Sequence, residues 1–250
     1  MITVHRAAGR HHWSNEWLDS WQSFPATGNY DLAGNAHGVL MVNNDDTIDP
    51  GEGLDRHRHS EVEILTWVLS GAVEHRDSKG HNGILRPGQI QRMTAGTGIT
   101  HSERNAMTRS SRAPARVVQM WVAPDTAGLA PSYAEADLTG QLDNGGLVLA
   151  ASGRPGHDAA VSLANRFAAL HVARLDAGGR CMLPAAPYGH LYLPTGEVSL
   201  PDAGSRAGGT VLHAGDAVRT RDAPAIEVIA GAPSELLYWE MHAAFDTAGG

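Results

Sequence analysis

Two pairs of polar residues, each spaced two apart, are the part of the sequence best suited to chemistry. His57 and His59 lie in GEGLDRHRHSEVEILTWVLSG, and His101 and Glu103 lie about 40 residues later in TAGTGITHSERN. In an extended strand, residues two apart point to the same face, so each pair can converge on one centre. Three neutral imidazoles and one carboxylate suit a divalent first-row metal such as Fe, Mn, Ni, Co or Cu. Four protein ligands leave positions for water, substrate or dioxygen, so the site could be catalytic.

The context of these residues matters more than the spacing of one pair. The chain has 14 histidines in 250 residues, so chance alone gives about one H-x-H pair. Burying three imidazoles and a carboxylate together without a cation, however, would cost several kcal/mol, and a metal ion removes that cost. An ordinary structural role is expected for the histidines that stand alone, which are His37, His75, His81 and His171.

The elements that must position these side chains are predicted to be β-strands. Runs rich in Val, Ile, Leu and aromatic residues occupy 38–43, 63–69, 117–122, 190–193 and 235–241, and Gly- and Pro-containing turns separate them. Many short strands with this punctuation indicate a sandwich or barrel. The one predicted helix face is the row of Trp13, Trp17 and Trp21, which are four residues apart and are expected to be structural.

An internal repeat indicates two copies of one β unit. VLSGAVEH (68–75) and ILRPGQIQRM (84–93) are matched by YLPTGEVSL (192–200) and VLHAGDAVRT (211–220), so that Gly71 pairs with Gly196 and Gly88 with Gly215. The segment 123–140, with two prolines and a polar remainder, has the composition of a linker. We therefore predict an N-terminal domain at 1–123, a linker at 124–140 and a C-terminal domain at 141–250.

Composition excludes several classes of protein and partner. The net charge of −8 opposes direct nucleic-acid binding, and no run of about 18 apolar residues could span a membrane. The N-terminal stretch lacks the pattern of a secretory signal, and the single cysteine, Cys181, cannot form an internal disulfide. A cytoplasmic location is therefore expected, and any metal site must use nitrogen and oxygen ligands.

Both halves of the candidate site match a known family pattern. Gly51, His57, His59 and Glu63 follow the first cupin motif, G-x5-H-x-H-x3-E, while Gly98, His101 and Asn105 follow the end of the second, G-x2-H-x3-N. More narrowly, WLDSW (17–21), HRHSEVEILTWVLSGAVEHRDS (57–78) and MTAGTGITHSE (93–103) resemble the pirin family, especially its bacterial quercetin 2,3-dioxygenase-like members. Where pirins usually read H-P-H, this chain has Arg58. The resemblance implies an all-β bicupin of two packed double-stranded β-helix (jelly-roll) barrels.

The resemblance also chooses between two carboxylates as the acid ligand. General cupins use the first-motif acid, here Glu63, whereas the pirin pattern uses the residue two after the third histidine, here Glu103. The implied metal ligands are His57, His59, His101 and Glu103, and Glu63 becomes a candidate for holding a ligand imidazole by its other N–H. The repeat aligns these ligands with Met182, Pro184, Val228 and Ala230, so the second barrel is expected to be metal-free.

The activity implied by the resemblance is a metal-dependent dioxygenase that opens the central ring of a flavonol such as quercetin and releases CO. Glu103 is the expected catalytic base, and the implied partners are a small aromatic substrate and O2. Fe2+ is the expected ion, with Mn, Ni, Co, Cu and Zn as alternatives. A second hypothesis from the same resemblance is an iron-containing redox-sensing regulator that binds a protein partner.

Overall fold

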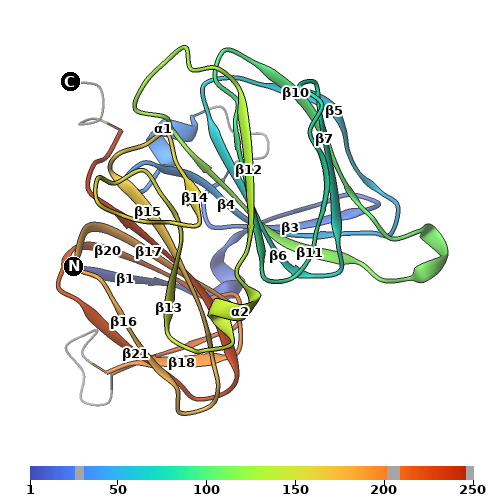
Figure 1. The fold of residues 1–250 in the computed structure, drawn as a ribbon. Coiled ribbons are helices and arrows are strands. Elements are labelled where there is room, and N and C mark those ends of the chain that lie inside the picture. Colours follow the sequence, from blue (N-terminus) through green and yellow to red (C-terminus); the bar gives the residue numbers. More distant parts are fainter. Residues whose placement is uncertain (26–30, 202–208, 246–250) are drawn as a thin grey trace.

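Short strands and tight turns build two β-barrels that pack against each other (Figure 1). The computed structural model describes residues 1–25, 31–201 and 209–245. In each barrel a seven-stranded sheet faces a four-stranded sheet, and every strand pairing is antiparallel except that of β13 with β14. The predicted all-β architecture of two barrels is confirmed.

The first barrel has the sheet orders β12-β9-β6-β11-β4-β3-β2 and β5-β10-β7-β8. Its strands are β2 (His11–Ser14), β3 (Leu18–Gln22), β4 (Leu40–Ile48), β5 (Gly53–His59), β6 (Glu63–Ser70), β7 (Val73–Asp77), β8 (Asn82–Leu85), β9 (Gln89–Thr94), β10 (Ile99–Asn105), β11 (Ala115–Val122) and β12 (Ser132–Asp137).

The second barrel repeats this plan with the orders β1-β20-β17-β22-β15-β13-β14 and β16-β21-β18-β19. Its strands are β1 (Ile2–His5), β13 (Leu147–Ser152), β14 (Val161–Ser162), β15 (Ala168–Leu175), β16 (Arg180–Leu183), β17 (Ala186–Thr195), β18 (Glu197–Leu200), β19 (Thr210–His213), β20 (Ala217–Ala223), β21 (Ile226–Ala230) and β22 (Ser234–Met241). The helices of the described ranges are single turns, α1 (Leu32–Asn35) and α2 (Thr139–Leu142) and the 3-10 turns Ala7–Gly9 and Arg109–Ser111, and none could cross a bilayer.

The repeated glycines occupy equivalent turns in the two barrels. Gly71 and Gly196 connect β6 to β7 and β17 to β18, with φ of 73° and 89°. Gly88 and Gly215 precede β9 and β20, with φ of 86° and 89°. Residues with a Cβ rarely adopt these values, so the repeat seen in the sequence marks the same two turns in each copy.

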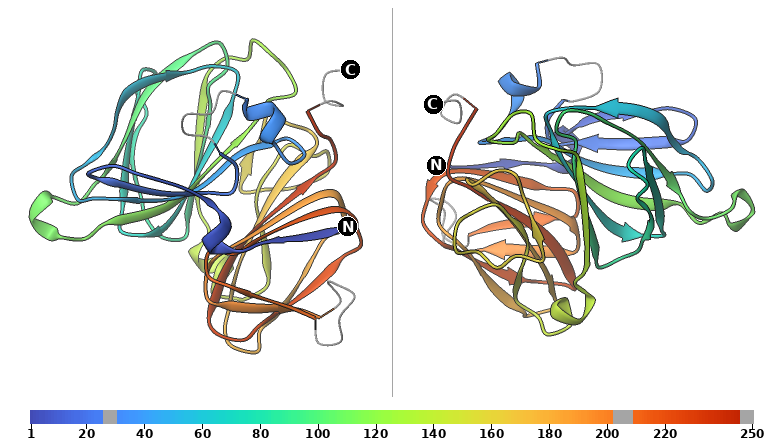
Figure 2. Two further views of the ribbon diagram at one scale, coloured as in Figure 1. Left: turned by 180° about the vertical axis from the view of Figure 1, so that it is seen from behind. Right: turned by 45° about the horizontal axis from the view of Figure 1, so that its top comes forward.

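Two strands cross the domain boundaries predicted from sequence. The N-terminal strand β1 pairs with β20 of the second barrel, and Figure 2 shows it beside the C-terminal strands. The predicted linker contains β12, which pairs with β9 at the edge of the first barrel. Each seven-stranded sheet thus has at one edge a strand from outside the predicted range of its barrel. This strand pairs with backbone groups that would otherwise be exposed at the edge.

The two large sheets pack face to face and bury one core between the barrels. Leu65 and Trp67 of β6 point into this core, where they share a cluster with Leu237 and Trp239 of β22. The indole N–H of Trp67 also donates a hydrogen bond of 2.6 Å to the Glu235 carboxylate across the interface. Along β6 the side chains alternate, so that Thr66 points the other way, into the first barrel.

The predicted tryptophan helix is wrong. Trp13 lies in β2 and Trp21 in β3, and these strands form a hairpin around Asn15. The side-chain oxygen of Asn15 accepts hydrogen bonds from the backbone N–H groups of Trp17 (2.9 Å) and Leu18 (2.8 Å). This Asx-type turn reverses the chain, and the spacing of four reflects two strands and a turn.

Candidate metal centre

The two histidine-bearing segments become neighbouring strands at one end of the first barrel. His57 and His59 lie on β5, and His101 and Glu103 lie on β10, which pairs antiparallel with β5 so that His101 is opposite His57. Burial alternates strictly along β10, with Ile99, His101 and Glu103 buried and the residues between them partly exposed. The period of two therefore holds along β10, and His101 and Glu103 both face the barrel interior.

Three imidazoles meet at this point. The ring centroid of His57 lies 4.7 Å from that of His59 and 4.5 Å from that of His101, and the His59–His101 distance is 5.2 Å. Each ring offers a nitrogen, and these nitrogens lie within 4.8 Å of one another. Bonds of about 2.1 Å to an octahedral ion place ligand atoms about 3.0 to 4.2 Å apart, so a small inward movement brings all three into range.

The imidazoles are held in the form that binds metals. Burial lowers the pKa of His59, and the neighbouring rings of His57 and His101 lower it further, to about 4, because they disfavour a second positive charge. Burial likewise lowers the pKa of His101 to about 4. Nδ1 of His57 lies 2.7 Å from the carbonyl oxygen of Asp55, so this nitrogen donates, and in the neutral ring Nε2 is the nitrogen with the electron pair. Near neutral pH, His59 and His101 are therefore unprotonated.

The carboxylate of Glu103 lies next to His101 but is drawn toward the barrel wall. It accepts hydrogen bonds from Thr66 (3.1 Å), Gln91 (3.4 Å) and Gln119 (2.6 Å). Burial opposes its ionisation, but His101 and the hydrogen bonds bring its pKa below the ordinary value. A carboxylate oxygen of Glu103 lies within 4.8 Å of a ring nitrogen of His101 and of one of His75. Glu103 does not form such a group with His57 and His59. Ligation of an ion by all four predicted residues thus requires this side chain to turn.

Glu63 lies outside the site. β5 ends at His59 and β6 begins at Glu63, and the intervening residues turn the chain, with Glu61 at φ of 53°. The shared strand face assumed for His59 and Glu63 therefore does not exist. Glu63 faces the second barrel, where its Oε2 accepts the Ala164 backbone N–H at 3.0 Å. The suggestion that it holds a ligand imidazole is wrong.

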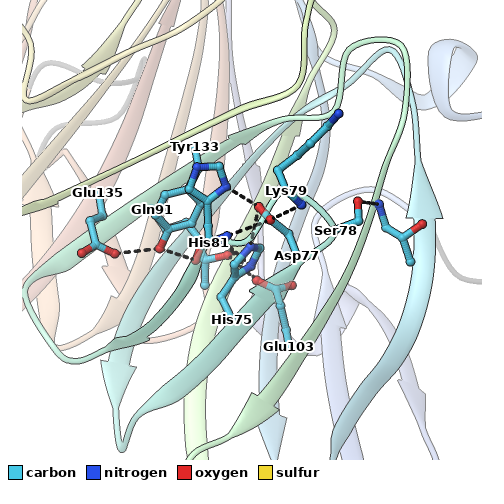
Figure 3. A network of polar contacts seen from close by, with 11 residues as sticks. His75, Asp77, Ser78, Lys79, His81, Gln91, Glu103, Tyr133 and Glu135 are labelled. Atoms are coloured by element: carbon cyan, nitrogen blue, oxygen red, sulfur yellow. Dashed lines mark hydrogen bonds and ion pairs between the residues drawn. The ribbon is translucent and has the colours of Figure 1, made fainter.

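His75, for which only a structural role was expected, is a neighbour of the predicted ligands. It lies on β7 directly opposite Glu103 on β10, is fully buried, and its ring centroid is 5.3 Å from that of His101. Figure 3 shows the network of polar contacts around it, which runs from Glu103 through Gln91 and His75 toward the surface. The alternation of VEHRD is a signal for its inward direction, but its register against Glu103 depends on strand pairing between distant segments.

The residues present fit a divalent metal ion. Both ring nitrogens of His101 are buried and have no hydrogen-bond partner among the residues that the structure describes. A fully buried imidazole without partners is costly, and a metal bond to one nitrogen offsets that cost. The donor set of imidazole nitrogen and carboxylate oxygen is that of Fe, Mn, Ni, Co, Cu or Zn.

The second barrel has an apolar interior at the equivalent place. Cys181 and Leu183 of β16 and Val228 and Ala230 of β21 belong to its hydrophobic core, and burial raises the pKa of the Cys181 thiol to about 11. Met182, aligned with a ligand by the repeat, is 54% exposed, which places it on the outer face. Across the described part of the chain, both groups of residues that could hold a metal lie in the first barrel.

Comparison with known proteins gives consistent matches. A family model described as pirin matches residues 2–122. A protein of Mycobacterium tuberculosis strain H37Rv, provisionally named a quercetin 2,3-dioxygenase, is 47% identical over 242 residues, which cover 97% of this chain and 96% of the relative. Escherichia coli K12 quercetin 2,3-dioxygenase is 42% identical over 133 residues, 53% of this chain and 56% of that protein. The crystal structure of the Escherichia coli pirin YhhW in complex with nickel(II) matches with a TM-score of 0.84 and 29% identity, covering 98% and 100% of the two chains.

Proposed function

Because this chain belongs to the pirin family, we propose that its first barrel is the active site of a metal-dependent dioxygenase that opens the central ring of flavonols such as quercetin with release of CO. The observation that carries the proposal is the meeting of three imidazoles at His101, whose buried nitrogens have no hydrogen-bond partner in the described part of the chain. The quercetin 2,3-dioxygenase names of the relatives support the reaction and the substrate class. Fe2+ is the proposed ion, although the solved relative contains nickel(II).

His57, His59, His101 and Glu103 would hold the ion. A divalent ion there supplies Lewis acidity, which lowers the pKa of a coordinated hydroxyl group. Glu103 is ionised and adjacent to His101, so it can accept the proton that a flavonol hydroxyl loses. The histidines contribute fixed positions, because β5 and β10 are paired strands of a sheet.

An aromatic wall stands beside the three imidazoles and suits a planar substrate. Trp121 packs edge-on against His59, with ring centroids 4.9 Å apart. Its indole N–H donates to Gln119 (3.2 Å), which in turn donates to Glu103 (2.6 Å). The same short chain of contacts therefore fixes both the wall and the proposed base.

The test is turnover of quercetin by protein loaded separately with Fe2+, Mn2+, Ni2+, Co2+, Cu2+ or Zn2+ in air. We expect loss of the flavonol absorption band with one CO released per quercetin for at least one ion. His101→Leu should abolish turnover, and His190→Leu, which changes a buried histidine of the second barrel, should retain it. Absence of CO from fully metal-loaded protein would reject the dioxygenase, and redox-dependent capture of a protein partner would then favour the regulatory hypothesis.

A further inference from the structure

We propose that His75 is a positioning residue for the metal centre, which acts through Gln91 to hold Oε1 of Glu103 in place while the other carboxylate oxygen, Oε2, turns toward the ion. The inference rests on the proposed metal site, but it does not depend on flavonol being the substrate. It starts from three buried side chains on three strands, β7, β9 and β10 (Figure 3).

Gln91 connects the histidine to the carboxylate. Its side-chain nitrogen lies 3.2 Å from Nδ1 of His75 and 3.4 Å from Oε1 of Glu103, and all three side chains are at most 3% exposed. The amide oxygen of Gln91 lies 3.3 Å from the Tyr133 hydroxyl. The opposite orientation of the amide would place its oxygen against a carboxylate, so the NH2 group faces both acceptors.

This amide orientation determines which nitrogen of His75 carries the proton. Nδ1 accepts from Gln91, so in the neutral ring the hydrogen is on Nε2. Nε2 lies 3.5 Å from Oδ2 of Asp77, whose side chain is fully buried. The ring is therefore oriented between an amide donor on one side and a carboxylate on the other.

Asp77 is itself firmly held. Its Oδ1 accepts the backbone N–H groups of Lys79 (2.8 Å) and His81 (3.0 Å), and its Oδ2 accepts Nδ1 of His81 at 2.8 Å. The ring of His81 stacks on that of Tyr133, with centroids 5.0 Å apart. The chain of contacts thus runs from a surface turn to the predicted ligand, and its weakest contact is at Nε2 of His75, which approaches Asp77 without a hydrogen bond to it.

The same contacts argue against His75 as a ligand, even though one of its ring nitrogens lies within 4.8 Å of a ring nitrogen of His101 and a carboxylate oxygen of Glu103. A ligand imidazole presents an electron pair to the ion, whereas Nδ1 of His75 already accepts from Gln91 and Nε2 carries the hydrogen facing Asp77. Without His75 the Gln91 amide loses one of its two acceptors and can rotate. Glu103 would then lose one of its three hydrogen bonds.

The experiment compares His75→Leu with His75→Asn. The Oδ1 of an asparagine can take the place of Nδ1 as the acceptor for Gln91, whereas leucine offers none. The readouts are the affinity for Co2+ and the visible absorption spectrum of the Co2+-loaded protein, which reports the ligands and their number. We expect leucine to weaken Co2+ binding by about 10- to 100-fold with an altered spectrum, and asparagine to restore both toward the wild type.

Gln91→Met removes the link from its other end and should reproduce the spectrum of His75→Leu, which keeps the test valid if that variant fails to fold. Wild-type affinity and spectrum in both His75→Leu and Gln91→Met would overturn the proposal. So would a loss in His75→Asn as large as that of His57→Ala, because His75 would then be a ligand. Neither readout uses a flavonol, so a lack of quercetin turnover would reject the proposed reaction and leave this inference standing.

Discussion

Replacing His101 with leucine should make the metal-free protein more stable. The His101 side chain is 1% exposed, and neither ring nitrogen has a hydrogen-bond partner within residues 1–25, 31–201 and 209–245. A buried polar group without a partner costs about 1–3 kcal/mol, and leucine has a similar volume and no polar atom. The free energy of unfolding of His101→Leu in the presence of a chelator should therefore exceed that of the wild type by about 1–3 kcal/mol.

A bound metal ion should raise the free energy of unfolding of the wild type but not that of His101→Leu. An ion at 100 times its dissociation constant stabilises the wild type by about 2.7 kcal/mol. His101→Leu should lose this response, because one of the three converging imidazoles is gone. The assay is urea unfolding followed by tryptophan fluorescence, with chelator and with Ni2+, for both proteins.

A matched control exists in the second barrel. His190 is also fully buried, and both of its ring nitrogens lack a hydrogen-bond partner among the described residues. His190→Leu should gain stability to a similar extent in chelator and should keep the full response to Ni2+. The reasoning is refuted if His101→Leu is less stable than the wild type in chelator, or if it keeps the metal response.

Three further predictions concern the base, a buried histidine and the contact between barrels. Glu103→Gln should lower kcat for quercetin by about 10²- to 10⁴-fold; full turnover with bound metal would assign the base to another group. Burial lowers the pKa of His37 from 6.5 to about 4, so stability that is present above pH 6.5 is lost as the pH falls toward 4. Between pH 7 and pH 4.5 this loss is about 2 kcal/mol, and His37→Gln should reduce it in urea unfolding at the two pH values. An unchanged pH dependence would contradict this. Trp67→Phe removes the hydrogen bond to Glu235 and should lower the free energy of unfolding by about 1–3 kcal/mol, and a wild-type urea midpoint would speak against its importance.

Features encoded locally could be predicted from the sequence. The strands at 63–69, 117–122 and 235–241 appear as β6, β11 and β22, because runs of β-branched and aromatic residues favour the extended backbone. The glycine turns repeat because only glycine readily adopts the positive φ found in both barrels. The spacing of two placed His101 and Glu103 on one face, because β10 is a regular strand through both residues.

Features set by distant contacts could not be predicted in this way. The predicted shared strand face of His59 and Glu63 is wrong because a turn separates the two residues and breaks the period of two. The position of His75 depends on the register of β7 against β10. The pairing of β1 with the second barrel and of β12 with the first depends on which sheet edges need partners. These pairings join segments far apart in the chain, and local pattern carries no information on them.

A crystal structure of the protein loaded with one divalent metal, with the ion located by anomalous scattering, tests the central claim most directly. We predict a single ion in the first barrel, about 2.0–2.2 Å from one nitrogen of each of His57, His59 and His101 and from an oxygen of Glu103, which turns from its present position to reach it. An ion bound through His75, an ion elsewhere in the chain, or no ion at all would contradict this assignment.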